Sequence, residues 1–339
     1  MKKTVIIFGI LMVSLLPVLA AQKASANGSA NGETLGVNVA SPSDIRAYEA
    51  RGWSYDLMMQ KPPLPSDTGN NTVLTAEASG TTDQALYLWE EGNMPHTTDY
   101  TRNSGSYFDD PDFRPYVTSM LVPKGTEAKG AVLLCAGGAF QFRGDYTEPV
   151  PTAEILNTLG FQCFIVDYRL RPYTQEEGAL DLARAVRFVR KNAEVYGIDP
   201  EDIAVMGYSA GGILAGEMLL NFDGLINGSS LDPSYVPDEL DEISANVSAD
   251  GMIYSFYGRL SVASKDVEKL RNGNLPPTWF CYGTRDPFVR EFEANIRCLE
   301  EAGVKVESLV LQDWPHGYGA EGGWVEPYAE WLDNIFRNN

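Results

Sequence analysis

From about residue 84 to the C-terminus, short apolar runs of strand length alternate with longer segments that have helical periodicity. This alternation constrains the fold more than any other feature, because neighbouring parallel strands must be joined by a crossover, which is usually a helix. One helix face is marked by apolar residues spaced by four, three and four positions, namely Leu182, Val186, Val189 and Ala193. The pattern predicts an α/β protein with a mostly parallel central sheet of about eight strands and helices on both faces.

The apolar runs give expected bounds for the strands and helices. We expect the first two strands, Ala85–Trp89 and Val117–Val122, to be antiparallel. The other strands are expected at Ala131–Cys135, Cys163–Asp167, Ile203–Met206, Met252–Tyr257, Thr278–Tyr282 and Val306–Leu311. Helices are expected at Ile213–Leu220, Glu291–Ala302 and Trp324–Phe336. On the helix that ends before Gly197, three arginines are expected to line a solvated face, with a binding stripe as the alternative: Arg184, Arg187 and Arg190.

The N-terminus has the pattern of an export signal. Lys2 and Lys3 precede a mostly apolar run that ends at Ala20, and small residues follow as far as Ala26. The run is shorter than the ~20 residues that a membrane-spanning helix needs. We therefore expect a signal peptide over residues 1–26, cleaved after Ala20 or Ala26, and a secreted protein, extracellular or periplasmic, with no stable membrane insertion after cleavage.

Charge and cysteine usage exclude several classes of protein. The chain has 26 Lys and Arg against 46 Asp and Glu, a net charge of −20, whereas a nucleic-acid binder needs a basic face to neutralise phosphates. The four cysteines are too widely spaced for a zinc site, and only two histidines are available to help. We expect buried single thiols at Cys135, Cys163 and Cys281, with a Cys281–Cys298 disulfide as the alternative.

The segment Gly207-Tyr208-Ser209-Ala210-Gly211-Gly212 follows a predicted strand and precedes an apolar helix. A G-x-S-x-G sequence in this context is typical of a nucleophile elbow, in which small residues let the chain turn tightly and expose the serine hydroxyl. The N–H of Ala210 would then face the reacting carbonyl oxygen. The same residues also fit an ordinary glycine-rich turn, so Ser209 is a candidate nucleophile that needs support from elsewhere in the chain.

A serine hydroxyl is a weak nucleophile at neutral pH and needs a neighbouring base. His316 lies in a loop after the last predicted strand, whereas His96 lies upstream of most strands and is expected on the surface. Asp286, which follows another strand, is the candidate to orient His316, with Asp313 as a rival on position alone. Ser209, Asp286 and His316 then occur in the chain order of α/β-hydrolases.

A second glycine-rich loop, Ala136-Gly137-Gly138-Ala139-Phe140, follows the third predicted strand. In hydrolases with a nucleophile elbow, this is the position of the loop that supplies the second N–H for the tetrahedral oxyanion. A Gly-Gly pair alone is only a turn. Four elements in the right order, however, favour a serine hydrolase.

Taken together, these segments resemble the α/β-hydrolase esterases, in particular bacterial secreted esterases related to acetyl-xylan and feruloyl esterases. The resemblance runs from about Leu86 to the C-terminus and rests on Ala136–Phe140, Asp167–Pro172, Gly197–Pro200, Ile203–Gly212, Leu275–Pro277, Gly283–Pro287 and His316–Gly319. It implies Ser209 as nucleophile, Asp286 as orienting carboxylate and His316 as base. It also implies oxyanion donors from Gly138 or Ala139 together with Ala210.

This chain departs from the related esterases at two places, and one segment lies outside the resemblance. Related lipases and esterases carry His-Gly-Gly-Gly where this chain has Ala136–Ala139, which removes a bracing hydrogen bond but no backbone donor. Residues 222–247 form a polar, acidic insertion that would either cover the pocket or be a surface loop. We assign residues 27–80 to a partly irregular N-terminal extension and residues 81–339 to an α/β-hydrolase catalytic domain.

The resemblance implies a secreted serine esterase that hydrolyses short-chain esters, above all acetyl esters on plant polysaccharides, through an acyl-enzyme and without a metal or organic cofactor. Its partner would be a small ester or an acylated carbohydrate, and no nucleic acid. A peptidase or lipase of the same fold and a non-catalytic, secreted carbohydrate-binding protein are the alternatives. Aromatic residues beside the motifs are candidates to stack on substrate, although each also fits ordinary core packing: Phe140, Phe142, Tyr208, Trp314 and Tyr318.

Overall fold

The computed structural model describes residues 55–65 and 78–339. The predicted signal peptide, residues 1–26, lies outside the described residues, and so does most of the predicted extension, residues 27–80. Both assignments stay predictions. Within the described part of the extension, α2 spans Tyr55–Met58.

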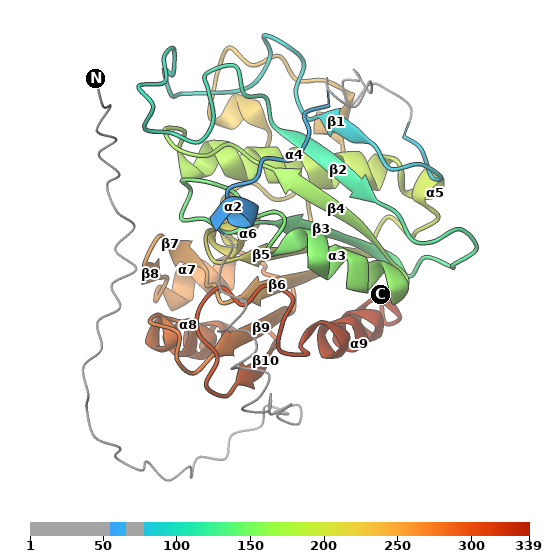
Figure 1. The fold of residues 1–339 in the computed structure, drawn as a ribbon, viewed down its shortest axis with the longest axis vertical. Helices are drawn as coiled ribbons and strands as arrows, with labels where there is room; N and C mark the ends of the chain where they lie inside the picture. The colour runs from blue at the N-terminus through green and yellow to red at the C-terminus, as the bar shows by residue number, and fades with distance from the viewer. Residues whose placement is uncertain (1–54, 66–77) are drawn as a thin grey trace. The chain divides into compact units, whose positions relative to one another are not determined.

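An eight-stranded, mostly parallel sheet forms the centre of the described structure, as the alternation of strands and helices predicts (Figure 1). Its strand order is β1-β2-β4-β3-β5-β6-β9-β10. The antiparallel pairs are β1 with β2 and β2 with β4, and the other neighbours are parallel. The strands are β1 Ala85–Tyr87, β2 Tyr116–Met120, β3 Gly130–Cys135, β4 Phe161–Asp167, β5 Ile203–Tyr208, β6 Ala249–Ile253, β9 Thr278–Gly283 and β10 Val306–Leu311.

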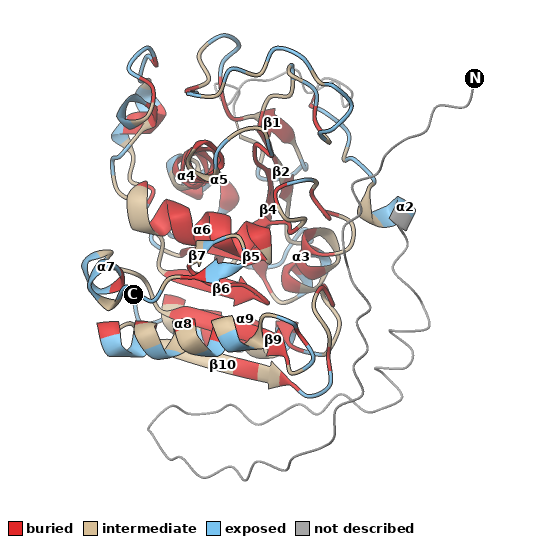
Figure 2. Ribbon diagram, turned by 90° about the vertical axis from the view of Figure 1, so that its left-hand side faces the viewer, coloured by how far each residue is buried: buried red, intermediate tan, exposed pale blue. Residues whose placement is uncertain are grey.

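Helices cover both faces of the sheet. Figure 2 shows α6 and α3 on opposite sides of β5, while α4 packs against α6 and α3 contacts α9. The remaining helices are α3 Pro149–Thr158, α4 Gln175–Lys191, α5 Ala193–Tyr196, α6 Ala210–Asn221, α7 Val267–Asn272, α8 Val289–Ala302 and α9 Val325–Phe336. Two 3₁₀ turns, η1 Gly228–Ser230 and η2 Glu239–Glu242, and a small hairpin of β7 Gly258–Arg259 with β8 Val262–Ala263 complete the elements.

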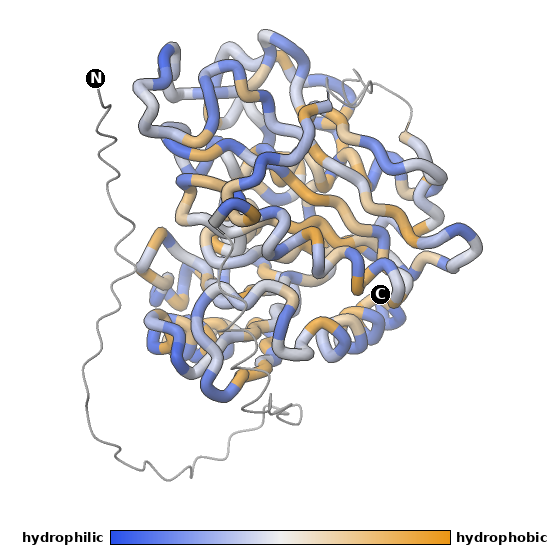
Figure 3. The backbone as a smooth tube through the Cα atoms, viewed as in Figure 1, coloured by the Kyte–Doolittle hydropathy of each residue, from blue (hydrophilic) through white to orange (hydrophobic). Residues whose placement is uncertain are grey.

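The core lies along the central strands. Every residue of β3, β4 and β5 is buried, which is expected for parallel strands that are covered on both faces. Figure 3 shows hydrophobic residues concentrated along these strands. Because the strands are held rigidly, the loops at their carboxyl ends can place functional groups accurately.

The largest difference between expected and observed strand bounds is at β6. The run Met252–Tyr257 was expected to be a strand, but β6 ends at Ile253. Tyr254 has φ of 38°, which takes the chain out of the sheet, although the aromatic side chains that follow remain buried in the core. An apolar run indicates burial, and it does not distinguish a buried strand from a buried loop.

The insertion, residues 222–247, is anchored to α4 by the arginine row, which we define as Arg184, Arg187 and Arg190. Arg187 donates hydrogen bonds to the backbone oxygens of Gly224, Ile226 and Ile243 at 2.6–3.2 Å. Arg190 likewise donates to the backbone oxygens of Ser244 and Asn246, and Arg184 pairs with the Asp238 carboxylate.

The expected solvated face is therefore wrong. The side chains of Arg184 and Arg187 are only 3% and 0% exposed. A stripe of arginines on a helix looks the same in the sequence whether water or another segment covers it.

The four cysteines all lie in the described ranges, and each is a free thiol. Cys135, Cys163 and Cys281 are buried, as expected for single thiols in central strands, and Cys298 is partly exposed. Among the helices of residues 55–65 and 78–339, none combines the length and the apolar character that crossing a membrane requires.

Candidate active site

The turn between β5 and α6 has the geometry of a nucleophile elbow. Ser209 follows the last residue of β5 and has φ of 48° and ψ of −114°, a conformation that costs energy for any residue except glycine. The flanking glycines make the turn sterically feasible. A Cβ on Gly207 would lie 2.2 Å from the Gly211 carbonyl carbon, and one on Gly211 would lie 2.0 Å from the Cys135 oxygen.

This close packing gives a stability prediction. Gly211→Ala is expected to lower the free energy of unfolding by about 3 kcal/mol, because backbone atoms must move to admit the methyl group. The control is Gly92→Ala, since Gly92 has a φ of 79° but no atom within 4 Å of the added Cβ. That variant should lose only the about 1–2 kcal/mol of backbone strain. Urea denaturation measures both, and equal losses would contradict the packing explanation.

The predicted nucleophile, base and carboxylate come together at the carboxyl ends of the strands. His316 Nε2 lies 2.9 Å from Ser209 Oγ, and His316 Nδ1 lies 2.6 Å from Asp286 Oδ2. With Nδ1 protonated and donating to Asp286, Nε2 carries the lone pair that can accept the serine proton. This relay can raise the nucleophilicity of Ser209 at neutral pH.

The Asp286 carboxylate is held in place on both oxygens. Its side chain is 0% exposed, one oxygen faces His316, and the other accepts a hydrogen bond from the Phe288 N–H at 2.8 Å. The rival, Asp313, is exposed and accepts a bond from the neighbouring Gln312 amide instead. His96 is exposed as expected and lies near Asp232.

The His316 ring is packed between two aromatic rings. Its centroid lies 4.9 Å from the Tyr254 ring and 5.6 Å from the Phe288 ring, both in edge-on arrangements. The His316 side chain is 19% exposed. The base is thus fixed in orientation and still reachable from solvent.

The oxyanion loop, which we define as residues 136–140, lies beside the elbow. Gly138 and Ala139 are partly exposed, and Ala139 has a φ of 54°. Within residues 78–339, no backbone or side-chain acceptor pairs with the N–H of Gly138, Ala139 or Ala210, so these donors are available to a ligand. Ala210 is also the first residue of α6, where the helix dipole favours negative charge.

Hydrogen bonds to its carbonyl groups hold the ends of the oxyanion loop. The Tyr168 hydroxyl donates to the Ala136 oxygen at 2.7 Å, and the Arg171 N–H donates to the Phe140 oxygen at 2.9 Å. Both donors belong to the segment Asp167–Pro172, which is one of the segments that carry the resemblance to esterases. That segment therefore supports the loop and supplies none of the three groups of the relay.

Most of the aromatic candidates for substrate stacking are buried in the core, which corrects that expectation. Phe140, Tyr208 and Trp314 are 6%, 0% and 1% exposed. Tyr318 is buried as well, and among the five candidates only Phe142 is partly exposed. The alternative of ordinary core packing holds for the buried four.

Two residues that the sequence did not single out lie between the oxyanion loop and the histidine loop, which we define as residues 314–319. Glu148 accepts a hydrogen bond from the Gly137 N–H at 2.5 Å and another from the Tyr254 hydroxyl at 2.8 Å. Tyr254 in turn contacts His316. No motif marks Glu148, because its partners are a backbone group and a tyrosine more than a hundred residues away.

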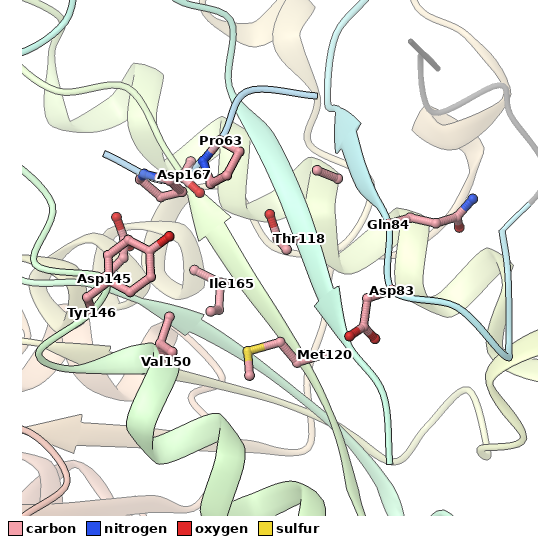
Figure 4. Close-up of a pocket in the computed structure, with 12 residues that line it drawn as sticks. Pro63, Asp83, Gln84, Thr118, Met120, Asp145, Tyr146, Val150, Ile165 and Asp167 are labelled. Atoms are coloured by element: carbon pink, nitrogen blue, oxygen red, sulfur yellow. The ribbon is translucent and has the colours of Figure 1, made fainter. Parts of the chain in front are cut away.

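A separate pocket of about 250 Å³ lies at the β2–β4 side of the sheet, and none of its lining residues belongs to the relay (Figure 4). Two buried carboxyl groups line it, Asp145 and Asp167. Arg143 donates to Asp167 and to Asp109, while burial raises the pKa of Asp145 above its usual range. Figure 4 shows Asp145 and Tyr146 beside each other on one side of the pocket.

Buried carboxyl groups also predict how stability changes with pH. Burial raises the pKa of Asp250, on β6, from 3.8 to about 7. Because the folded pKa is raised, the protonated form favours folding, and this contribution is lost as the pH rises towards 7 and above. Relative to the wild type, Asp250→Asn should therefore gain about 2–3 kcal/mol of stability between about pH 5 and pH 8. Urea denaturation at both pH values measures this difference. The exposed Asp112→Asn is the control and should show no such change.

Comparisons with known proteins show what this chain is similar to in sequence. The BD-FAE family matches residues 119–256, which include the oxyanion loop and the elbow. Similar curated proteins include an acetylxylan esterase from Xylanibacter ruminicola, 33% identical over 25% of this chain and 18% of the relative. Endo-1,4-beta-xylanase B from Butyrivibrio fibrisolvens is 28% identical over 38% of this chain and 19% of the relative. Esterase LipQ from Mycobacterium tuberculosis is 32% identical over 51% of this chain and 47% of the relative. The chain thus spans about a fifth to a half of the length of these relatives.

Solved structures share the fold. An acetyl ester-xyloside bifunctional hydrolase from Caldicellulosiruptor lactoaceticus superposes with a TM-score of 0.56 at 21% identity, covering 75% of this chain and 96% of that chain. A thermophilic esterase from Thermogutta terrifontis, Est2, superposes with a TM-score of 0.51 at 19% identity, covering 67% of this chain and 90% of that chain. The predicted α/β-hydrolase fold and the resemblance to esterases are confirmed.

Proposed function

We infer that this chain, whose residues 119–256 match the BD-FAE family, is a serine carboxylic ester hydrolase. It removes short acyl groups, above all acetyl, from plant-polysaccharide carbohydrate. We also infer that the protein is exported from the cell. Ser209, His316 and Asp286 form its catalytic triad. The observation that carries the proposal is the unbroken relay from Ser209 Oγ through His316 to the buried Asp286 carboxylate.

In the first half-reaction, His316 Nε2 accepts the Ser209 proton as the hydroxyl oxygen attacks the ester carbonyl carbon. The carbonyl oxygen becomes an oxyanion, which accepts hydrogen bonds from the backbone N–H of Ala210 and from that of Gly138 or Ala139. The tetrahedral intermediate collapses, the C–O bond breaks, and His316 protonates the departing alcohol. Asp286 stabilises the imidazolium that exists between the two proton transfers.

In the second half-reaction, water replaces the alcohol. His316 removes a proton from the water as it attacks the acyl group on Ser209, and the same backbone donors hold the new oxyanion. Collapse returns the proton to Ser209 Oγ and releases the carboxylic acid. Only the neutral imidazole can act as base in both half-reactions.

The assignment of acetylated carbohydrate as substrate is supported by the relatives. An acetylxylan esterase, a xylanase and an acetyl ester-xyloside hydrolase are among the proteins that this chain resembles in sequence or fold. The chain's acidic charge and its predicted signal peptide fit an enzyme that acts on polymers outside the cell.

The experiment is hydrolysis of acetylated xylan and of a nitrophenyl ester series from acetate to decanoate by the purified protein. We expect release of acetate from xylan and rates that fall beyond short acyl chains. Highest rates on long acyl chains would favour a lipase instead. If the protein hydrolyses none of these esters, the ester hydrolase assignment is wrong, and a peptidase or a carbohydrate-binding protein is favoured.

Export is tested separately. The full chain expressed in a bacterial host should accumulate outside the cytoplasm, and N-terminal sequencing of the mature protein should begin at residue 21 or residue 27, after Ala20 or Ala26. A protein that stays in the cytoplasm and still begins at Met1 would contradict this part of the proposal.

A further inference from the structure

We propose that Glu148 is a positioning residue for the ester-hydrolysis reaction: its single buried carboxylate holds the oxyanion loop and the histidine loop in their reactive arrangement. The inference rests on the proposed esterase function and assigns a role outside the triad and the oxyanion donors. It concerns a residue that touches neither the substrate nor the reacting atoms and acts through its two partners.

The first partner is the oxyanion loop itself. The Gly137 N–H donates to Glu148 Oε2 at 2.5 Å, so the carboxylate fixes the peptide immediately before the candidate donors. Gly137 packs closely against Glu148 and the β5 backbone. A Cβ added to Gly137 would lie 2.9 Å from the Tyr208 backbone oxygen and 3.0 Å from Glu148 Oε2. Bonds from Tyr168 and Arg171 hold the two ends of the loop. Glu148 binds the second residue of the loop, next to the candidate donor Gly138.

The second partner connects Glu148 to the base. The Tyr254 hydroxyl donates to Glu148 Oε1 at 2.8 Å and accepts a bond from the Gly319 N–H at 3.3 Å. The Tyr254 ring centroid lies 4.9 Å from that of His316 and 4.7 Å from that of Tyr318. One carboxylate therefore reaches the oxyanion loop with one oxygen and, through Tyr254, the histidine loop with the other.

The oxyanion loop needs support from outside the loop. Ala139 and Phe140 have φ values of 54° and 58°, in the left-handed region that is unfavourable for side chains. Such strain persists only where the surroundings hold the backbone in place. The departure from the His-Gly-Gly-Gly sequence of related enzymes removes one brace from this loop. Glu148, the residue that precedes α3, supplies a brace through the Gly137 N–H.

Glu148 does not perform the usual structural tasks of a buried acid. It is the residue that precedes α3, yet its side chain makes no capping hydrogen bond to that helix. Across residues 55–65 and 78–339, no lysine or arginine forms an ion pair with it, although it is only 5% exposed. Burial raises its pKa from 4.5 to about 7. A neutral side chain would avoid this cost, so the carboxylate is better explained by the two loops than by stability.

The test compares Glu148→Ala with Glu148→Gln in steady-state hydrolysis of nitrophenyl acetate. We expect kcat of Glu148→Ala to fall about 100-fold, with KM within about threefold of wild type, because a displaced donor affects the oxyanion more than the bound ester. Glu148→Gln should retain kcat within about tenfold, since its amide oxygen can accept the Gly137 N–H and its NH₂ can donate to the Tyr254 hydroxyl. Rescue by the isosteric amide would show that the two hydrogen bonds, and not the negative charge of the carboxylate, support turnover.

Two further variants complete the design. Tyr254→Phe keeps the ring against His316 but removes the hydroxyl, and it should lower kcat about tenfold, even if Glu148→Ala fails to fold. Asp250→Asn is the matched control, because Asp250 is a buried carboxylate on β6 outside the relay and its supporting contacts, and its kcat should stay within about threefold of wild type. The proposal is overturned if Glu148→Ala keeps wild-type kcat, if Glu148→Ala and Glu148→Gln lose equal amounts, or if the loss lies in KM.

A structural readout separates failure of this inference from failure of the proposed function. Crystal structures of Glu148→Ala and Glu148→Gln need no turnover. The Gly137–Ala139 peptides should be displaced in the alanine variant and retained in the glutamine variant. If wild type hydrolyses no ester, the esterase assignment is wrong, while an unmoved loop in Glu148→Ala would refute the positioning role by itself.

Discussion

Ser209→Ala is expected to lower kcat for acetyl esters by about 10⁶-fold, which is the scale seen when the nucleophile of a triad is removed. The variant keeps the oxyanion donors of Ala139 and Ala210, so a residual acceleration of about 10³-fold over water should remain. KM should change little. Initial rates with nitrophenyl acetate and acetylated xylan, measured beside wild type, give the effect on both kinds of substrate.

The control for this substitution is Ser229→Ala. Ser229 is an exposed serine in the insertion and should keep wild-type activity. A fluorophosphonate gives a second readout, because an activated serine forms a covalent adduct that intact-mass measurement detects. Wild type and Ser229→Ala should gain one adduct, and Ser209→Ala should gain none. Activity or labelling that survives in Ser209→Ala would remove Ser209 as the nucleophile.

Asp286→Asn is expected to lower kcat by about 10⁴-fold with little change in fold, as for loss of the orienting acid in other triads. The reason lies in the Phe288 N–H, which donates to one Asp286 oxygen. In the variant this N–H would hold the amide carbonyl, and the NH₂ group would face His316 Nδ1. The histidine would then carry its proton on Nε2 and could not accept the proton of Ser209.

Asp313→Asn is the matched control for this change. Both aspartates lie within the loops around His316, but Asp313 is exposed and bonded to Gln312. Its kcat should stay within about threefold of wild type. A large loss in Asp313→Asn with none in Asp286→Asn would exchange the roles of the two residues and contradict the relay.

The layout of the fold is readable from the sequence because burial on both faces produces apolar runs. The runs at β3, β4 and β5 match the observed strands to within a few residues. The same signal fails after Ile253, where buried aromatic residues belong to a loop. It fails again for the arginine row, since a sequence records which residues a helix carries and not which segment covers them.

The candidate site likewise contains residues that the sequence predicts and residues that it does not. Ser209, His316 and Asp286 are chosen by residue type and by position after strands, because proton transfer requires those functional groups. Glu148 could not be chosen so, since its role depends on a backbone N–H and on Tyr254, which is remote in the chain. Tyr208 and Trp314 show the opposite error: residues beside a motif in sequence can point into the core.

The anchoring of the insertion has a consequence for how this protein can change. Two of the three arginines in the arginine row, Arg187 and Arg190, hold main-chain oxygens, which every amino acid carries. Substitutions at exposed positions of the insertion, such as Leu225 and Val236, leave those oxygens in place. The segment can therefore diverge in sequence, or be redesigned with new surface chemistry, while its attachment to α4 is preserved.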